Sequence, residues 1–124
     1  MEVNKSLIKS FQYAIEGVKL AYKYNRNIRI HTIFAILAII LSLVLQITWF
    51  EFGLILLTIL LVMSAEMINT AIEEMVNLII QEHRQQAKIA KDAAAGMVLI
   101  TAIGSVVIGA IIFLPYIFTL VGLR

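Results

Sequence analysis

The sequence predicts an all-α membrane protein in which an amphipathic N-terminal surface helix precedes three transmembrane helices. Two observations predict this class. Of the 124 residues, 61% are hydrophobic, and the mean hydropathy of +0.95 is far above that of soluble domains. Long uncharged stretches also alternate with short charged ones. A chain of this length holds one domain at most, so residues 1–124 are predicted to form a single membrane unit.

The chain has no cysteine, which excludes a disulfide framework, a thiolate zinc site and a thiol nucleophile. The first 29 residues are charged throughout and lack the continuous apolar region of a cleavable signal peptide. We therefore expect the N-terminal segment to belong to the mature protein.

The surface helix is predicted at about residues 5–24. Its polar positions recur every three or four residues, which places them on one stripe: Lys5, Lys9, Gln12, Glu16, Lys19 and Lys23. Apolar residues such as Phe11 and Val18 lie on the opposite face. A basic stripe opposite an apolar one is typical of a helix in the cytoplasmic membrane interface. A helix packed on a partner protein is the alternative, whereas nucleic-acid binding would leave the apolar face exposed.

The three transmembrane helices are predicted at about residues 31–50, 53–80 and 93–121. The first contains an uncharged run that ends in an aromatic pair, Trp49 and Phe50, as expected at a membrane interface. A tight turn is expected directly after this pair. The second helix would be roughly 40 Å long, which exceeds a hydrocarbon layer of about 30 Å. The third is interrupted late by Pro115 and carries a stripe of small residues, Thr101, Ser105 and Gly109, suited to close helix contact.

The distribution of basic residues predicts the orientation in the membrane. Six of the ten lie before the first span and three lie between the second and third spans. By the positive-inside rule, the N-terminus and the 81–92 loop are expected on the cytoplasmic side and the C-terminus outside.

One face of the second span is polar. It carries four residues at helical spacing: Glu66, Asn69, Glu73 and Asn77. Counted from the start of the predicted helix, Glu66 lies ~20 Å along it, within the hydrocarbon, and Glu73 lies ~30 Å along it, at the cytoplasmic boundary. The two carboxylates are therefore expected to have different environments.

This difference in depth suggests different chemical roles. An ionisable group at the depth of Glu66 costs on the order of 2.5–3.5 kcal/mol, and burial disfavours the charged form, which suits a general base. Glu73 is nearer water and suits Mg²⁺, which prefers carboxylate oxygens. The alternatives are a protonated Glu66 that bonds to a neighbouring helix, and a solvated helix end at Glu73 and Glu74.

No soluble nucleotide-binding or catalytic motif is present. The sequence has no phosphate-binding G-x-x-x-x-G-K-[ST] loop, no G-x-G-x-x-G fingerprint and no Ser-His-Asp arrangement. Gly104 and Gly109 have part of the loop spacing, but they lie in the middle of an apolar span. His31 and His83 are predicted to be interfacial residues rather than ligands.

Two sequence blocks resemble the prokaryotic diacylglycerol kinase family. The first is Glu66-Met-Ile-Asn-Thr-Ala-Ile-Glu73, and the second is Ala90-Lys-Asp-Ala-Ala-Ala-Gly96. The amphipathic N-terminal helix and the three spans correspond as well. The stretch Asn27-Ile-Arg-Ile-His31 is similar to the Gram-positive branch, which includes undecaprenol kinases.

The resemblance implies a homotrimer in the bacterial cytoplasmic membrane that transfers the γ-phosphate of ATP to a lipid hydroxyl, with Mg²⁺ as cofactor. It implies Glu66 as the catalytic base, with Glu73 and Asn25 at the metal and Asn69 and Arg29 in support. Predicted ATP contacts are Tyr13, Asn25, Glu73, Glu82, Lys91 and Asp92. The expected partners are ATP, a membrane lipid alcohol and the bilayer, and no nucleic acid.

Two positions depart from the family pattern. Asn25 stands where the family usually carries a second metal-binding glutamate, and Asn77 stands where an aspartate is common. An amide oxygen can bind Mg²⁺ but supplies no charge, so we predict activity with weakened metal affinity. Asn25→Glu should lower the Mg²⁺ concentration needed for half-maximal rate, and an unchanged requirement would remove residue 25 from the metal shell.

Undecaprenol is the predicted acceptor, and diacylglycerol, which would give phosphatidic acid, is the alternative substrate. Two functions of another class remain open. Glu66 and Asn69 inside the membrane could belong to a proton- or ion-conducting oligomer, which would give flux without ATP. A non-catalytic membrane scaffold would be unaffected by Glu66→Ala.

Overall fold

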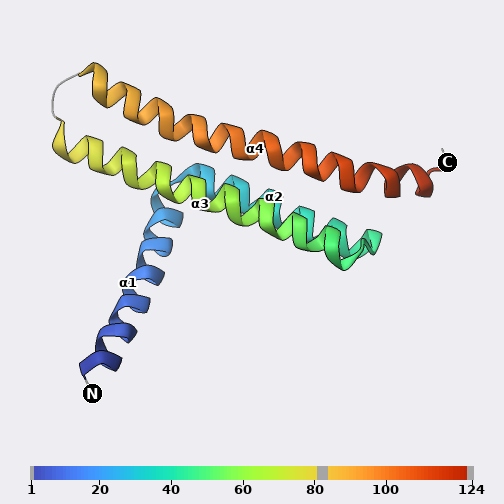
Figure 1. Ribbon diagram of the computed structural model, residues 1–124, viewed down its shortest axis with the longest axis horizontal. Helices are drawn as coiled ribbons and strands as arrows, with labels where there is room; N and C mark the ends of the chain where they lie inside the picture. The colour runs from blue at the N-terminus through green and yellow to red at the C-terminus, as the bar shows by residue number, and fades with distance from the viewer. Residues whose placement is uncertain (1, 81–83, 123–124) are drawn as a thin grey trace.

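The computed structural model describes residues 2–80 and 84–122, with side chains from Ser6 onward. Figure 1 shows the helices in chain order: α1 (Glu2–Tyr24), α2 (Arg26–Leu45), α3 (Trp49–Ile79) and α4 (Gln85–Leu120). The last three run side by side as an antiparallel bundle, while α1 leaves it at the start of α2. The described part of the chain contains no strand, which confirms the predicted all-α class.

The junction between α1 and α2 is a single residue, Asn25. Its backbone N–H still bonds to the Ala21 carbonyl at 2.8 Å, but its extended backbone (φ −100°, ψ 113°) ends the first helix. The side-chain oxygen then accepts a hydrogen bond from the Asn27 N–H at 2.8 Å, which caps the start of α2. The helix axis therefore changes direction at this residue.

The turn between α2 and α3 lies earlier than the sequence predicts. Gln46 has a left-handed backbone (φ 51°) that ends α2, and Thr48 caps α3. The Glu51 N–H bonds to Thr48 Oγ1 at 3.3 Å, and the Thr48 N–H bonds to Glu51 Oε2 at 2.9 Å. This reciprocal pair is a capping box, so the turn precedes Trp49 and Phe50, which belong to the second span.

The two longest helices begin earlier than the predicted spans. At ~1.5 Å per residue, α3 is about 46 Å long and α4 about 54 Å. Helix α4 starts at Gln85, so residues 85–92 of the predicted 81–92 loop are helical, and Pro115 lies inside the helix without ending it. Both helices therefore continue past the hydrocarbon layer.

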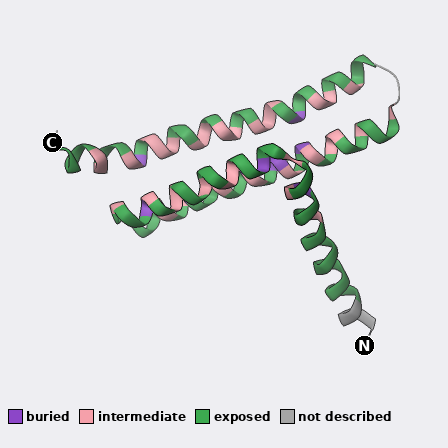
Figure 2. Ribbon diagram, turned by 180° about the vertical axis from the view of Figure 1, so that it is seen from behind, coloured by how far each residue is buried: buried purple, intermediate pink, exposed green. Residues whose placement is uncertain are grey.

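The bundle buries few residues, as expected for helices that pack against lipid. Helices α2, α3 and α4 are each long and apolar enough to cross a membrane. Most of their large apolar side chains are exposed, and Figure 2 shows that several buried positions gather where α1 meets the bundle. In water such a surface would aggregate, whereas in a bilayer acyl chains cover it.

The predicted stripe of small residues does not make a close helix contact within one chain. A Cβ atom added at Gly104 would meet nothing within 4 Å, and one at Gly109 would meet only the Phe113 ring at 3.9 Å. Ser105 and Gly109 instead line an apolar cavity of about 320 Å³ between α2, α3 and α4. Phe113 lines the same cavity.

Candidate active site

Glu66 is the most buried ionisable side chain that the structure describes. It is 1% exposed and lies on α3 where α1, α2 and α3 meet. A carboxylate in such surroundings is costly unless polar groups contact it. Its neighbours therefore determine what it can do.

The Asn25 side chain supplies one of these polar contacts. Its Nδ2 donates to Glu66 Oε2 at 3.3 Å and to Thr70 Oγ1 at 2.6 Å. Because Oδ1 of the same amide caps α2, all of its polar atoms are in use. In this structure Asn25 thus presents a donor to Glu66, and its oxygen would have to leave the helix cap to bind a metal.

His31 supplies a second contact, which the sequence analysis did not predict. Its Nε2 lies 3.2 Å from Glu66 Oε1, and its side chain is 25% exposed. No spacing signal could have found this pair, because His31 and Glu66 lie on different helices. His31 also lines the apolar cavity between α2, α3 and α4.

Asn69 and Glu73 continue the polar face of α3 beyond Glu66. Asn69 is 5% exposed, and its Nδ2 donates to Glu73 Oε1 at 3.1 Å. This bond directs the amide nitrogen toward Glu73, while the buried Oδ1 of Asn69 has no hydrogen-bond partner. An unsatisfied buried oxygen beside a half-buried carboxylate leaves oxygen lone pairs available for a ligand.

Lys91 and Asp92 lie on α4 near the end of α3. The Lys91 ammonium donates to Asn77 Oδ1 at 2.6 Å, which joins the two helices, and Asp92 pairs with Lys88 one turn earlier on α4. The polar face of α3 and the basic segment of α4 therefore lie at the same end of the bundle. Asn77, which stands where the family commonly has an aspartate, accepts this bond from Lys91.

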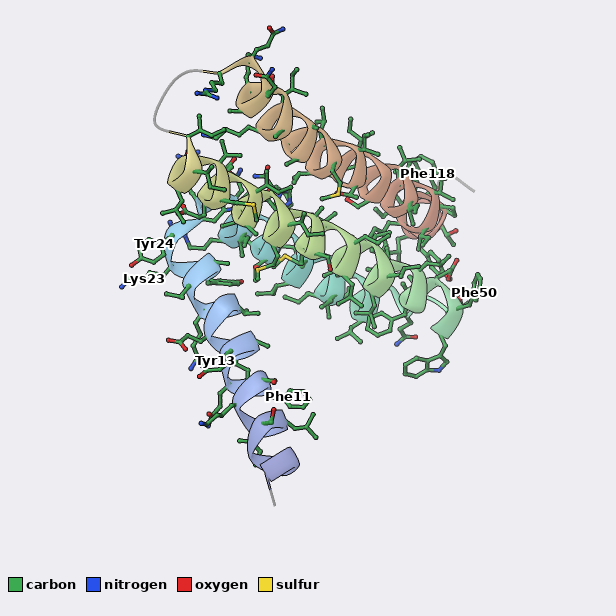
Figure 3. The ribbon with its side chains drawn as sticks, turned by 60° about the vertical axis from the view of Figure 1, so that its left-hand side comes forward. Phe11, Tyr13, Lys23, Tyr24, Phe50 and Phe118 are labelled. Carbon is green, nitrogen blue, oxygen red and sulfur yellow. The ribbon has the colours of Figure 1, made fainter. Side chains whose placement is uncertain are left out.

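The structure does not bring every predicted residue to Glu66. Tyr13 is 68% exposed on α1, away from the bundle, and Figure 3 shows it on the projecting helix with Phe11. Arg29 is exposed on α2. Glu82 and His83 lie outside the described residues. Predicted nucleotide contacts from Tyr13 and Glu82 therefore stay predictions.

The residue types on the polar face of α3 have the chemistry that a magnesium ion requires. Mg²⁺ is usually held by one or two carboxylates and keeps water and phosphate oxygens as its other ligands. Glu73 supplies a carboxylate, and the unpartnered Asn69 Oδ1 supplies a neutral oxygen. Within residues 2–80 and 84–122, no three or more acidic, histidine or cysteine side chains form a group that could hold a metal ion.

Comparisons with known proteins agree with this architecture. A family model described as prokaryotic diacylglycerol kinase matches residues 12–113. A diacylglycerol kinase of Synechocystis is 41% identical over 115 residues, with 92% of this chain and 66% of that protein aligned. An undecaprenol kinase of Bacillus subtilis is 40% identical over 114 residues, with 92% of each chain aligned. A diacylglycerol kinase of Haemophilus influenzae is 34% identical over 108 residues, covering 86% of this chain and 92% of that protein.

The family match includes both sequence blocks, all of α2 and α3, and α4 as far as residue 113. These relatives carry the names of lipid kinases. The length and apolar composition of its helices make the chain a multi-pass membrane protein. The chain therefore belongs to the prokaryotic diacylglycerol kinase family, which confirms the lipid-kinase class that the sequence predicts.

Proposed function

We propose that the chain transfers the γ-phosphate of ATP to the hydroxyl group of undecaprenol at the cytoplasmic surface of the bacterial cell membrane. The observation that carries the proposal is the polar face of α3, where a buried carboxylate, Glu66, precedes a half-buried one, Glu73, by two helical turns. A membrane alcohol and a water-soluble phosphate donor can meet only where such a face reaches the interface.

Glu66 is the proposed catalytic base. It accepts the hydroxyl proton as the lipid oxygen attacks the γ-phosphorus, while the bond from that phosphorus to the bridging oxygen of ADP breaks. The products are a lipid monophosphate, ADP and a proton, which Glu66 later releases. Phosphoryl transfer needs mainly positioning and charge stabilisation, so a small membrane site can support it.

Glu73 is the proposed carboxylate ligand of Mg²⁺, with the unpartnered Asn69 Oδ1 and the predicted ligand Asn25 as candidate neutral ligands. When bound, Mg²⁺ neutralises charge on the transferring phosphate. Lys91 adds a cation at the same end of the bundle, and we propose that it, Asp92, Tyr13 and Glu82 contact the nucleotide. Arg29 would support the site from α2.

Undecaprenol is proposed as the acceptor because the undecaprenol kinase of Bacillus subtilis aligns over 92% of both chains. Diacylglycerol is the second candidate, favoured by the names of the Synechocystis and Haemophilus relatives. A homotrimer is part of the proposal, as the resemblance implies. The exposed apolar residues of the projecting α1 are available to pack on another subunit or on the membrane.

The test is a transfer assay in mixed micelles with Mg²⁺ and γ-labelled ATP, with undecaprenol and diacylglycerol offered in parallel. We expect label in undecaprenyl phosphate at the higher initial rate. Faster labelling of diacylglycerol would support the second candidate, and label in neither lipid would overturn the kinase function. Liposomes that contain the protein should show no proton flux without ATP, which would exclude the ion-conducting alternative.

A further inference from the structure

The two oxygens of the Glu66 carboxylate are contacted by different elements. Oε2 accepts a hydrogen bond from Asn25, at the junction of α1 and α2. Oε1 lies 3.2 Å from His31 Nε2 on α2, and it has no completed hydrogen bond. An imidazole N–H is thus within reach of the one carboxylate oxygen that lacks a partner.

The position of His31 is determined by packing. Ile28, three residues earlier on the same face of α2, is 1% exposed and anchors this turn in the bundle. The cap at Asn25 fixes the start of the same helix. The imidazole is therefore presented to Glu66 by a helix end that is held at two points.

We infer that His31 is a positioning residue for the proposed base, an inference that rests on the proposed function. Its Nε2–H donates to Glu66 Oε1 and, together with Asn25, holds the carboxylate in one orientation. A carboxylate offers about four acceptor positions, so lone pairs remain to take the proton of the lipid hydroxyl. Catalytic hydrogen bonds are often long before substrate binds and tighten in the reacting complex.

The physical reason for such a residue is the orientation of the base. A carboxylate held at one oxygen alone can rotate about its terminal bond, and an error of about 1 Å in placing a reacting group can cost on the order of 100-fold in rate. A second donor from α2 prevents this rotation. His31 is expected to affect the rate of transfer and not the affinity for the lipid.

The experiment compares three substitutions in the labelled-ATP assay. His31→Gln keeps an N–H donor at about the position of Nε2, whereas His31→Leu removes it, and His31→Asn keeps polarity but is too short to reach Oε1. Phe34→Leu is the matched control, because Phe34 lies one turn further along α2 and lines the same cavity as His31. The kcat and the KM for the lipid are measured for each.

We expect His31→Leu and His31→Asn to lower kcat about 10- to 100-fold with the lipid KM within about twofold, and His31→Gln to retain most of the rate. The Phe34→Leu variant should retain its kcat. A wild-type rate in His31→Leu or His31→Asn, or a loss confined to KM, would overturn the inference. If wild-type protein labels no lipid, the proposed function itself fails.

A second measurement does not depend on activity. The infrared band of the Glu66 carboxyl group is identified by subtracting the spectrum of Glu66→Gln. We expect this band to shift in His31→Leu and to keep its position in Phe34→Leu. An unchanged band in His31→Leu would show that the imidazole does not bond to Glu66 and would also overturn the inference.

Discussion

Asn25 connects three parts of the molecule through one amide. Its oxygen caps α2, and its nitrogen donates to Glu66 on one side and Thr70 on the other. An ionised glutamate could accept hydrogen bonds here but could not donate to Glu66. The same amide thus caps α2 and holds the carboxylate of the proposed base. An uncharged residue at position 25 therefore has a structural role that an ionised glutamate could not fill.

Replacing this amide by an acid tests that account. Asn25→Asp keeps the capping oxygen but places a second carboxylate oxygen next to Glu66, so the hydrogen bond is lost and like charges meet. We expect a loss of stability of about 1–3 kcal/mol, measured as a lower Tm in detergent without Mg²⁺.

Asn27→Asp is the control for this substitution, because Asn27 is exposed and only its backbone N–H joins the cap. It should change the Tm little. An equal Tm for Asn25→Asp and the unchanged protein would mean that the Asn25 amide does not bond to Glu66.

Lys91 is the residue that tests the nucleotide end of the site. Its ammonium bonds to Asn77 on α3, and in the proposed function it turns to the phosphate oxygens of ATP. We expect Lys91→Gln to raise the KM for ATP about 10- to 100-fold, as for loss of a charge-assisted hydrogen bond. Lys88→Gln, one turn earlier, should have a smaller effect, and equal effects would argue against a specific role for Lys91.

Between helices, Glu51 joins the start of α3 to the end of α4. Its Oε2 accepts hydrogen bonds from the Thr48 N–H and hydroxyl, and from the Tyr116 hydroxyl at 2.7 Å. The α3–α4 pair is therefore held by polar contacts at both ends, by Tyr116 and Glu51 at one and by Lys91 and Asn77 at the other. This arrangement keeps the polar face of α3 in register with α4.

Removing the Tyr116 hydroxyl should weaken the bundle without affecting the site. Tyr116→Phe is expected to destabilise the protein by about 0.5–1.5 kcal/mol, seen as a lower Tm in detergent, with the rate per folded molecule retained. Thr119→Val is the control, because Thr119 bonds only within α4, to the Pro115 carbonyl. If both variants melted alike, the link between α3 and α4 would contribute nothing.

Composition and hydropathy predict the three spanning helices, because their apolar runs are long and uncharged. The turn after α2 was placed too late because Trp49 and Phe50 are apolar and extend the run. The pattern Thr48-x-x-Glu51 was a usable signal for a capping box at this point. The extension of α4 back to Gln85 was missed because its first turns are charged, although they are helical.

The polar face of α3 was predictable because helical spacing places Glu66, Asn69 and Glu73 together. The contacts of Glu66 with Asn25 and His31 were not, because they depend on how α2 packs against α3. No local pattern encodes a pairing between residues so far apart in sequence. The unsatisfied oxygen of Asn69 likewise emerges only from packing.

For the whole molecule, the proposed function requires that Glu73, Lys91 and the α1–α2 junction reach the cytoplasmic side together. The chain has no cysteine, so single cysteines can report this directly. With a membrane-impermeant maleimide, Gln86→Cys should be labelled only after cell lysis, and Phe50→Cys should be labelled in intact spheroplasts. Figure 3 shows Phe50 at the end of the bundle remote from α1. The reversed pattern would place the proposed site on the wrong side of the membrane.

The most direct test of the central claim is the rate of phosphoryl transfer in Glu66→Gln, which preserves shape but removes the proton acceptor. Glu74→Gln, an exposed position on the same helix, is the matched control. At saturating ATP and Mg²⁺, we predict that Glu66→Gln loses about 10²- to 10⁴-fold in kcat while binding of a fluorescent ATP analogue is retained, and that Glu74→Gln retains its rate. Equal rates in Glu66→Gln and the unchanged protein would contradict the account.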